Sequence, residues 1–364
     1  MTLKDKLVST TPQERSGSRA SNRLDYQKSW ALCHLLDLHE NGRDYLFLFD
    51  YQDDVLVLDS EDDPKEIDFF QVKTKDDGHW TKTALTARPK GKDKVLLGSI
   101  LGKLLANHIR FPKHTKSLNL VSNQIFSLKF KGASGSTTRV ALDKLDQQEL
   151  DAILEALRTE HRLPTKPDCA KIFFLHVSSL SLQDHSTHAM GILSKFLDTL
   201  YPNAKLPVAA VYRSLCDEIK RRTNVESLPE DFSQLQKSRG LGRKRFKELL
   251  ADVKPADQFS AAVTTAINQL RHEGALFDEL QEIQAACNQL EIDRMNGSDV
   301  VLRRARKAIE ASILALKTAK QSATTLRGKL QAVTEDVRPK TADLISAKST
   351  YYRSALIVMA IYGF

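Results

Sequence analysis

Residues 67–80, IDFFQVKTKDDGHW, read as a buried β-strand that nonetheless carries charged and amide side chains. Side chains alternate across a strand, so the residues of this one divide into two faces. One face is Phe70, Val72 and Thr74, and the other is Gln71, Lys73 and Lys75. On an edge strand the lysines would meet water and block pairing with another edge. The alternative is that the polar face lines a metal-dependent active site, and the rest of the chain decides between the two.

The chain around this strand alternates between helical and β-rich patterns. The expected elements are, in order, a helix at 25–40, strands at 45–50, 55–59 and 67–75, a helix at 95–109, a strand at 118–122 and a β-ribbon at 125–141. Gly42 ends the first helix, because glycine readily takes the left-handed conformation that closes one. A helix, a meander of three strands, a second helix and another strand predict a mixed α/β domain.

After about residue 143 the pattern becomes mainly helical. Helices are expected at 144–161, 190–201 and 208–223, a single further strand at 171–180, and only helical periodicity from residue 256 onward. We therefore expect the chain to have three parts. They are a flexible N-terminus at 1–22, an α/β domain with an extension at 23–225, and an all-α domain at 226–364 that serves regulation or oligomerisation.

Composition places the chain among ordinary globular proteins with a modest basic excess. Hydrophobic residues make up 41% and charged residues 27% of its 364 residues, and the net charge of +8 is compatible with an acidic partner such as nucleic acid. Four widely spaced cysteines without a CxxC pair argue against a zinc ribbon or a disulfide scaffold and fit a reducing compartment. The start, MTLKDKLVST, lacks the apolar core of a signal peptide, and no apolar run approaches the roughly 18 residues of a membrane span. A cytoplasmic protein without membrane contact is therefore expected.

An acidic turn precedes the polar strand. FDYQDDVLVLD, residues 49–59, ends one expected strand and begins the next, and antiparallel pairing brings Asp54 near Gln71 and Lys73. Hydrolysis of a phosphodiester uses carboxylates to hold Mg²⁺, the metal to activate water, and a lysine to orient that water and offset negative charge. The candidate metal ligands are Asp50, Asp53, Asp54 and Asp59. Asp54 is favoured because it opens the strand that pairs with the Q-x-K strand, and Asp53 comes second.

These residues resemble the PD-(D/E)xK superfamily of restriction-endonuclease-like nucleases, in the variant where Gln replaces the second acid. The segments ASNRLDYQKSWAL, FLFDYQDDVLVLDS and IDFFQVKTK are similar to the N-terminal nuclease domain of the CD-NTase-associated double-strand DNA endonucleases of bacterial anti-phage defence. The similarity covers residues 17–122 and continues in LHVSSLSLQDHSTHAMGILSKFLDTLYP and VYRSLCDEIKRRT. The chain departs from the superfamily in lacking a proline before the acid and in carrying Gln71, whose neutral amide is a weaker metal ligand than a carboxylate.

The resemblance implies a restriction-endonuclease-like fold and assigns roles to the residues that match. Asp54 and Gln71 would hold Mg²⁺ or Mn²⁺, and Lys73 would be the catalytic lysine. Gln27, on the first helix, matches a position where such nucleases add a polar residue to the site. Further candidates are Asp53 and Lys75. The implied reaction is metal-dependent hydrolysis of double-stranded DNA.

A basic run, QKSRGLGRKRFKELL at 236–250, is the candidate for contact with DNA phosphates. Its nucleic-acid-binding residues would be Arg239, Arg243, Lys244, Arg245 and Lys247. The basic, solvated start of a helix is the alternative interpretation of the same residues.

The partners expected for this chain follow mainly from the resemblance. The chain contains no GxxxxGK[ST] sequence, so it is not expected to hydrolyse ATP itself. Related nuclease domains occur in Lamassu systems beside an SMC-like ATPase, and elsewhere beside a HerA-type translocase, so an ATPase partner is implied. The founding family carries a sensor of cyclic oligonucleotides after the nuclease, where only helices are expected here. A cut through both strands needs two active sites, which predicts a homo-oligomer, a dimer or larger.

The competing interpretation is a protein that binds without cutting, either an inactive nuclease fold that grips DNA or a helical adaptor of a defence complex. An acidic cluster too far from Lys73 to share a metal with it would favour that interpretation. RNA and single-stranded DNA are alternative substrates, because metal-assisted hydrolysis would use the same residues on them.

Overall fold

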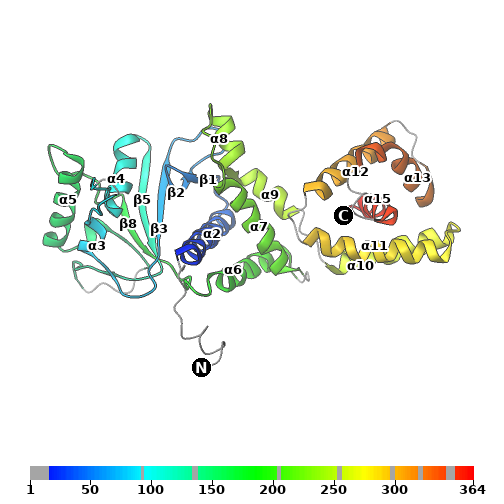
Figure 1. Ribbon diagram of the computed structural model, residues 1–364, viewed down its shortest axis with the longest axis horizontal. Helices are drawn as coiled ribbons and strands as arrows, with labels where there is room; N and C mark the ends of the chain where they lie inside the picture. The colour runs from blue at the N-terminus through cyan, green and yellow to red at the C-terminus, as the bar shows by residue number, and fades with distance from the viewer. Residues whose placement is uncertain are drawn as a thin grey trace, which may run out of the picture. The chain divides into compact units, whose positions relative to one another are not determined.

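The structure is a computed structural model, and it describes residues 16–91, 94–132, 138–202, 206–251, 256–295, 300–318, 323–341 and 349–364. The chain forms two compact units, a sheet unit made of Met1–Phe196 and Glu218–Lys247, and a helical unit made of Leu197–Asp217 and Glu248–Phe364. As predicted, a mixed α/β sheet domain comes first and an all-helical region follows (Figure 1).

A seven-stranded sheet is the centre of the sheet unit, with strand order β7-β8-β5-β3-β2-β1-β9. Its strands are β1 Leu46–Tyr51, β2 Asp53–Leu58, β3 Ile67–Lys73, β5 Thr115–Ser122, β7 Arg139–Ala141, β8 Phe173–Val177 and β9 Gly240–Gly242. The meander β1-β2-β3 is antiparallel, as expected, while β3, β5 and β8 run parallel. A two-stranded sheet pairs β4 Trp80–Thr81 with β6 Phe126–Ser127.

Helices cover both faces of this sheet, with α4 and α5 on one side and α2 on the other (Figure 1). The helices within the unit are α2 Ser16–Glu40, α3 Lys82–Thr86, α4 Ile100–Arg110, α5 Gln147–His161 and α8 Phe232–Arg239, with the 3-10 turn η1 Leu142–Lys144. Each of three more helices contains a boundary between the two units. These helices are α6 His185–Leu200, α7 Val208–Thr223 and α9 Arg243–Ala251. Leu104 and Leu157 are buried in one apolar cluster with Phe69 of the sheet. On the other face, Trp30 and His34 contact Phe70.

The helical unit surrounds the apolar stretch near the end of the chain. Its helices are α10 Ala256–His272, α11 Phe277–Met295, α12 Val300–Thr318, α13 Leu326–Val337 and α15 Thr350–Ile361, with the 3-10 turn η2 Pro339–Thr341. Every residue from 355 to 359 is buried, as expected for a helix that is apolar all round and packs inside a protein. The helices α11, α12 and α13 pack against α15. None of the described helices is both long and apolar enough to span a membrane.

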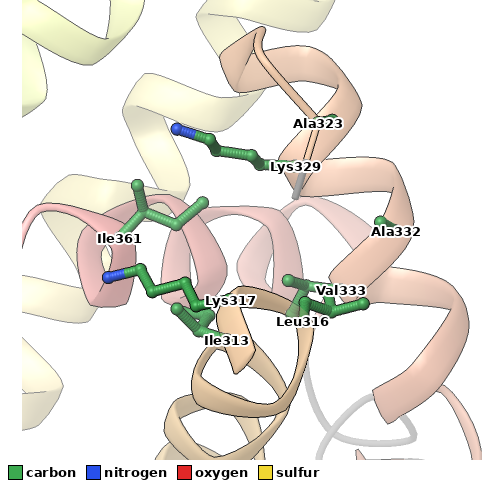
Figure 2. A pocket seen from close by; sticks show the side chains of 8 residues that line it. All are labelled: Ile313, Leu316, Lys317, Ala323, Lys329, Ala332, Val333 and Ile361. Atoms are coloured by element: carbon green, nitrogen blue, oxygen red, sulfur yellow. The ribbon is translucent and has the colours of Figure 1, made fainter. Parts of the chain in front are cut away.

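A pocket of about 120 Å³ lies in the helical unit between α12, α13 and α15 (Figure 2). Apolar side chains of the three helices line it, among them Ile313, Val333 and Ile361. Lys317 and Lys329 add two ammonium groups to this lining (Figure 2). The pocket contains none of the residues that the sequence predicts for an active site.

The first helix and the helix before β5 differ from their expected bounds. The structure begins α2 at Ser16, although a start near residue 25 is expected from the sequence. Residues 1–15 of the expected flexible N-terminus lie outside the described residues. The helix expected at 95–109 is α4, and it begins at Ile100. The Ser99 hydroxyl accepts a hydrogen bond from Gly102 N there and caps the first turn.

Two short β-segments also depart from expectation. The described parts of 125–141 do not pair into a ribbon, because β6 pairs with β4 and β7 pairs with β8. The strand β9 lies within the region that was expected to be all-helical, but it pairs with β1 at the edge of the sheet. Glycine is required at Gly240, since an added Cβ would overlap the backbone of Gln236, whereas at Gly242 it would meet the end of the Glu61 side chain.

Candidate active site

The carboxylate of Asp54 sits where the pairing of β2 with β3 ends. The register of that pairing stops at Val55 opposite Phe70, and Asp54 Oδ2 then accepts a hydrogen bond from Val72 N at 2.8 Å. The side chain therefore takes the place of the next backbone acceptor. Lys73 Nζ lies 3.7 Å from the same oxygen. The structure thus brings Asp54 and Lys73 together, as their positions on neighbouring strands predicted.

Gln27 reaches the same point from α2. Its amide Nε2 donates to Asp54 Oδ2 at 3.1 Å and to Val72 O at 3.2 Å. The helix is held against the sheet by buried apolar residues, including Leu32 and Leu35, which fixes Gln27 at the end of the strands. The second oxygen of the carboxylate, Asp54 Oδ1, has no hydrogen-bond partner among the described residues.

Asp53 is oriented by two donors. Asp54 N donates to its Oδ1 and Asn107 Nδ2 of α4 donates to its Oδ2, both at 2.9 Å. Burial, followed by the negative charge of Asp54, raises the pKa of Asp53 to about 7. Burial also raises the pKa of Asp54, although the positive charge of Lys73 opposes that shift. Two neighbouring carboxylates with raised pKa values gain from a bound cation, because its charge removes the repulsion between them.

Gln71 lies next to these groups along the strand and is 6% exposed. Its Oε1 atom is buried and has no hydrogen-bond partner in the described part of the chain. Leaving a buried acceptor unsatisfied costs about 1–3 kcal/mol, so a bound ligand that contacts this atom would lower the free energy of the site. Hard cations such as Mg²⁺ and Mn²⁺ take oxygen ligands, and Gln71 Oε1 and Asp54 Oδ1 supply two of them. The donor set therefore fits such an ion.

The described residues contain no group of three or more His, Cys, Asp and Glu side chains arranged to hold a metal. A cation at Asp54 would consequently depend on few protein ligands. Mg²⁺ commonly binds in this way, since it keeps several waters and uses one or two carboxylates.

The remaining candidates on the strand and the turn have other roles. Lys75 Nζ donates to His79 O at 2.6 Å and lies 4.3 Å from the centre of the Trp80 ring. Asp59 accepts hydrogen bonds from the backbone N–H groups of Lys65 and Glu66. Burial of Asp59 acts to raise its pKa, but these N–H groups outweigh that effect and lower it.

Asp50 is exposed and stands in the turn with a φ of 49°. Its negative charge contributes to the raised pKa of Asp54. Of the four candidate acids, Asp53 and Asp54 are therefore the two that the structure surrounds with other residues of the predicted site.

The predicted basic run does not form one free surface. Arg239 is 7% exposed and donates to Asp50 O at 2.6 Å and to Val225 O. Arg243 donates to the backbone carbonyls of His39 and Arg43. The other three have varied surroundings: Lys244 pairs with Asp62 at 2.9 Å, Arg245 lies 3.7 Å from Glu218, and Lys247 is exposed. Contact of this run with DNA stays a prediction, and Lys244 and Lys247 are its exposed members.

Comparison with known proteins gives a family and a relative. Residues 15–223 match the family model described as "Cap4, dsDNA endonuclease domain". The chain is 26% identical over 255 residues to the Lamassu protein LmuA of Bacillus cereus (strain VD014), a match that covers 68% of this chain and 67% of that protein. The resemblance inferred from the sequence motifs is confirmed. The matched segment contains Gln27, Asp54 and Lys73, whereas Arg239 lies beyond it.

Proposed function

Because the chain belongs to the family of Cap4 dsDNA endonuclease domains, we propose that it hydrolyses double-stranded DNA with Asp54, Gln71 and Lys73 as the central residues of its active site. The observation that carries this proposal is the distance of 3.7 Å between Lys73 Nζ and Asp54 Oδ2. The proximity supports a nuclease over the binding-only alternative.

We further propose that the reaction depends on Mg²⁺ or Mn²⁺. The carboxylate of Asp54 and the amide oxygen Gln71 Oε1 would hold the ion, since both are oxygen ligands and Gln71 Oε1 is buried without a donor among the described residues. When bound, such an ion lowers the pKa of water and neutralises charge on the departing oxygen. Gln27 and Val72 N keep Asp54 Oδ2 occupied, which leaves Oδ1 as the oxygen free to act as a ligand.

Lys73 has the position and the charge of a catalytic lysine. Its side chain is 33% exposed, so the ammonium can meet both the buried carboxylate and a substrate phosphate. An ammonium there can orient the attacking water and offset the negative charge that develops on the phosphorus centre. That stabilisation acts in the transition state, so its loss should reduce the rate of cutting more than the binding of DNA.

The wider biological proposal is a role in anti-phage defence. It is supported by the relationship to LmuA, whose name assigns it to Lamassu. We propose that assembly controls the nuclease, with a homo-oligomer supplying two active sites for a cut through both strands. An SMC-like or HerA-type ATPase is the proposed partner.

Cleavage of supercoiled plasmid by the purified protein tests the central proposal. Mg²⁺ should permit linearisation, EDTA should prevent it, and Lys73→Ala should slow it by about 100-fold or more. The control is Lys116→Ala, which removes an exposed lysine of β5 that pairs with Glu66, the residue before β3. A series of protein concentrations shows whether assembly alone activates cutting. A wild-type rate in Lys73→Ala would refute the assignment of Lys73. No cutting at any concentration would leave either the binding-only alternative or a nuclease that requires its ATPase partner, and adding that partner would decide between them.

A further inference from the structure

The turn between β1 and β2 carries the acids of the candidate site in a conformation that most residues avoid. Asp50 and Gln52 have φ angles of 49° and 65°. Both lie in the left-handed region, where non-glycine residues are uncommon. Such a conformation persists only where the surrounding structure holds it. The contacts of this turn therefore decide how Asp53 and Asp54 are presented.

Asn107 of α4 holds the acidic end of the turn. It is 2% exposed, and its Nδ2 donates to Asp53 Oδ2 at 2.9 Å. Since Asp54 N donates to the other oxygen of Asp53, the carboxylate has a donor on each side and a fixed orientation. The hydrogen bond from Asp54 N to Asp53 also ties the backbone of Asp54 to that orientation. One turn along α4, Arg110 donates to the side chain of Gln52.

Arg239 of α8 holds the other end of the turn. One arm of its guanidinium donates to Asp50 O and the other to Val225 O. A planar guanidinium is suited to bridging two acceptors in a fixed geometry. Its Nε is buried without a partner in the described part of the chain. Burying such a group is costly, which favours a positional role over a purely stabilising one.

We propose that Asn107 and Arg239 are positioning residues for DNA hydrolysis, and that they fix the turn so that Asp54 faces Gln71 and Lys73. The inference rests on the proposed function, because it takes Asp54 as a residue of the active site. Arg239 lies outside residues 15–223, the segment that matches the family model. It reaches the turn because β9, which follows it directly, pairs with β1. A part of the chain beyond the family match thus completes the site.

Asn107→Ala and Arg239→Lys test this proposal. The first removes the donor that orients Asp53, and the second leaves an ammonium that cannot bridge two carbonyls in the same geometry. We expect each variant to cut DNA about 10- to 100-fold more slowly at saturating DNA, the range found when a group that orients a metal ligand is lost. Binding of a labelled duplex in Ca²⁺, followed by fluorescence anisotropy, should stay near the wild-type value.

Binding of Mn²⁺, followed by electron paramagnetic resonance, gives a readout that does not require cleavage. Both variants should bind the ion about 10-fold or more weakly than the wild type. Asn119→Ala and Arg222→Lys are matched controls, because Asn119 donates to Phe69 O and Arg222 to Lys237 O, away from the turn. Both should keep wild-type affinity for Mn²⁺, whatever their melting temperatures.

The outcomes separate the positioning role from the function on which it rests. Wild-type cleavage and Mn²⁺ affinity in folded Asn107→Ala and Arg239→Lys would overturn the positioning role, and so would equal losses in the two controls. A wild-type protein that binds Mn²⁺ but does not cut DNA would contradict the proposed function, while weaker Mn²⁺ binding in the two variants would still support positioning. A wild-type protein that neither cuts nor binds Mn²⁺ would overturn both.

Discussion

The charge of Asp53 depends strongly on its surroundings. Its pKa is raised to about 7 by burial and by the charge of Asp54, and the donors Asp54 N and Asn107 offset only part of that effect. Without a cation, about half of the Asp53 side chains are therefore protonated in neutral solution. Burial of the ionised carboxylates and the repulsion between them raise the free energy of the folded protein, and binding of a cation lowers it.

We expect the contribution of Asp53 to the stability of the protein in EDTA to fall as the pH rises from about 4 to about 7. The folded-state pKa of Asp53 is about 7, above the value of about 3.9 for an unfolded chain, so the folded state binds more protons in this window. The contribution of Asp53 is fully present below the unfolded pKa and is lost as the pH rises through the folded pKa. Thermal unfolding at about pH 5 and about pH 8 should therefore show a larger loss for the wild type than for Asp53→Asn.

Asp63→Asn is the control for this measurement. It removes an exposed carboxylate that pairs with Lys65 on the connection between β2 and β3. Its pH dependence should follow that of the wild type. Identical pH dependence in Asp53→Asn and the wild type would show that Asp53 does not titrate as its burial requires.

The sequence could predict only some of the residues in this site. Asp54, Gln71 and Lys73 could be placed together because strand pairing and alternation are regular. Asn107 could not, since its contact with Asp53 depends on how α4 packs against the sheet, and no spacing rule joins the two. Arg239 was assigned to DNA because an arginine that binds backbone carbonyls looks the same in sequence as one that binds phosphates.

Among the elements, β9 depends most on the absence of side chains. We expect Gly240→Ala to lower the free energy of unfolding by about 1–3 kcal/mol, because the new Cβ would overlap the backbone of Gln236. Gly191→Ala is the matched control: that glycine is exposed within α6, and nothing lies within 4 Å of an added Cβ. Alanine there should raise stability by about 0.5–1 kcal/mol. Urea denaturation measures both, and a neutral Gly240→Ala would show that β9 tolerates a side chain.

The elements also show where periodicity stops being informative. The meander β1-β2-β3 was predictable because each strand is a β-rich run bounded by turn residues. The strand β9 is three residues long, Gly-Leu-Gly, and has no pattern to read. The pairing of β7 with β8 rather than with β6 is set by distant packing, so a ribbon was the natural but incorrect expectation for 125–141.

At the scale of the whole molecule, two units with separate cores should unfold separately in calorimetry. Mg²⁺ should stabilise the sheet unit alone. At a concentration about one hundred times the dissociation constant, its free energy of unfolding should rise by about 2.7 kcal/mol, and its melting temperature should rise with it. Gln71→Leu should abolish that shift, because it replaces the buried Oε1 by an apolar group. A shift of both transitions, or a full shift in Gln71→Leu, would contradict a cation site at Gln71.

Periodicity along the chain predicted the large-scale order of an α/β part before a helical part. It did not predict that the sheet unit would include Glu218–Lys247, after the chain has already contributed Leu197–Asp217 to the other unit. An interrupted unit of this kind has no marker in composition, because helices on either side of the division have the same amphipathic pattern.

This interleaved order has a consequence for biosynthesis. A ribosome makes the chain from its N-terminus, so β1, β2 and β3 emerge long before β9 and Arg239. Residue 239 must leave the exit tunnel before the guanidinium can reach Asp50 O. A nascent or prematurely terminated chain therefore carries the acids and the lysine but not the group that holds their turn. The order of translation itself would delay completion of the proposed active site until most of the polypeptide exists.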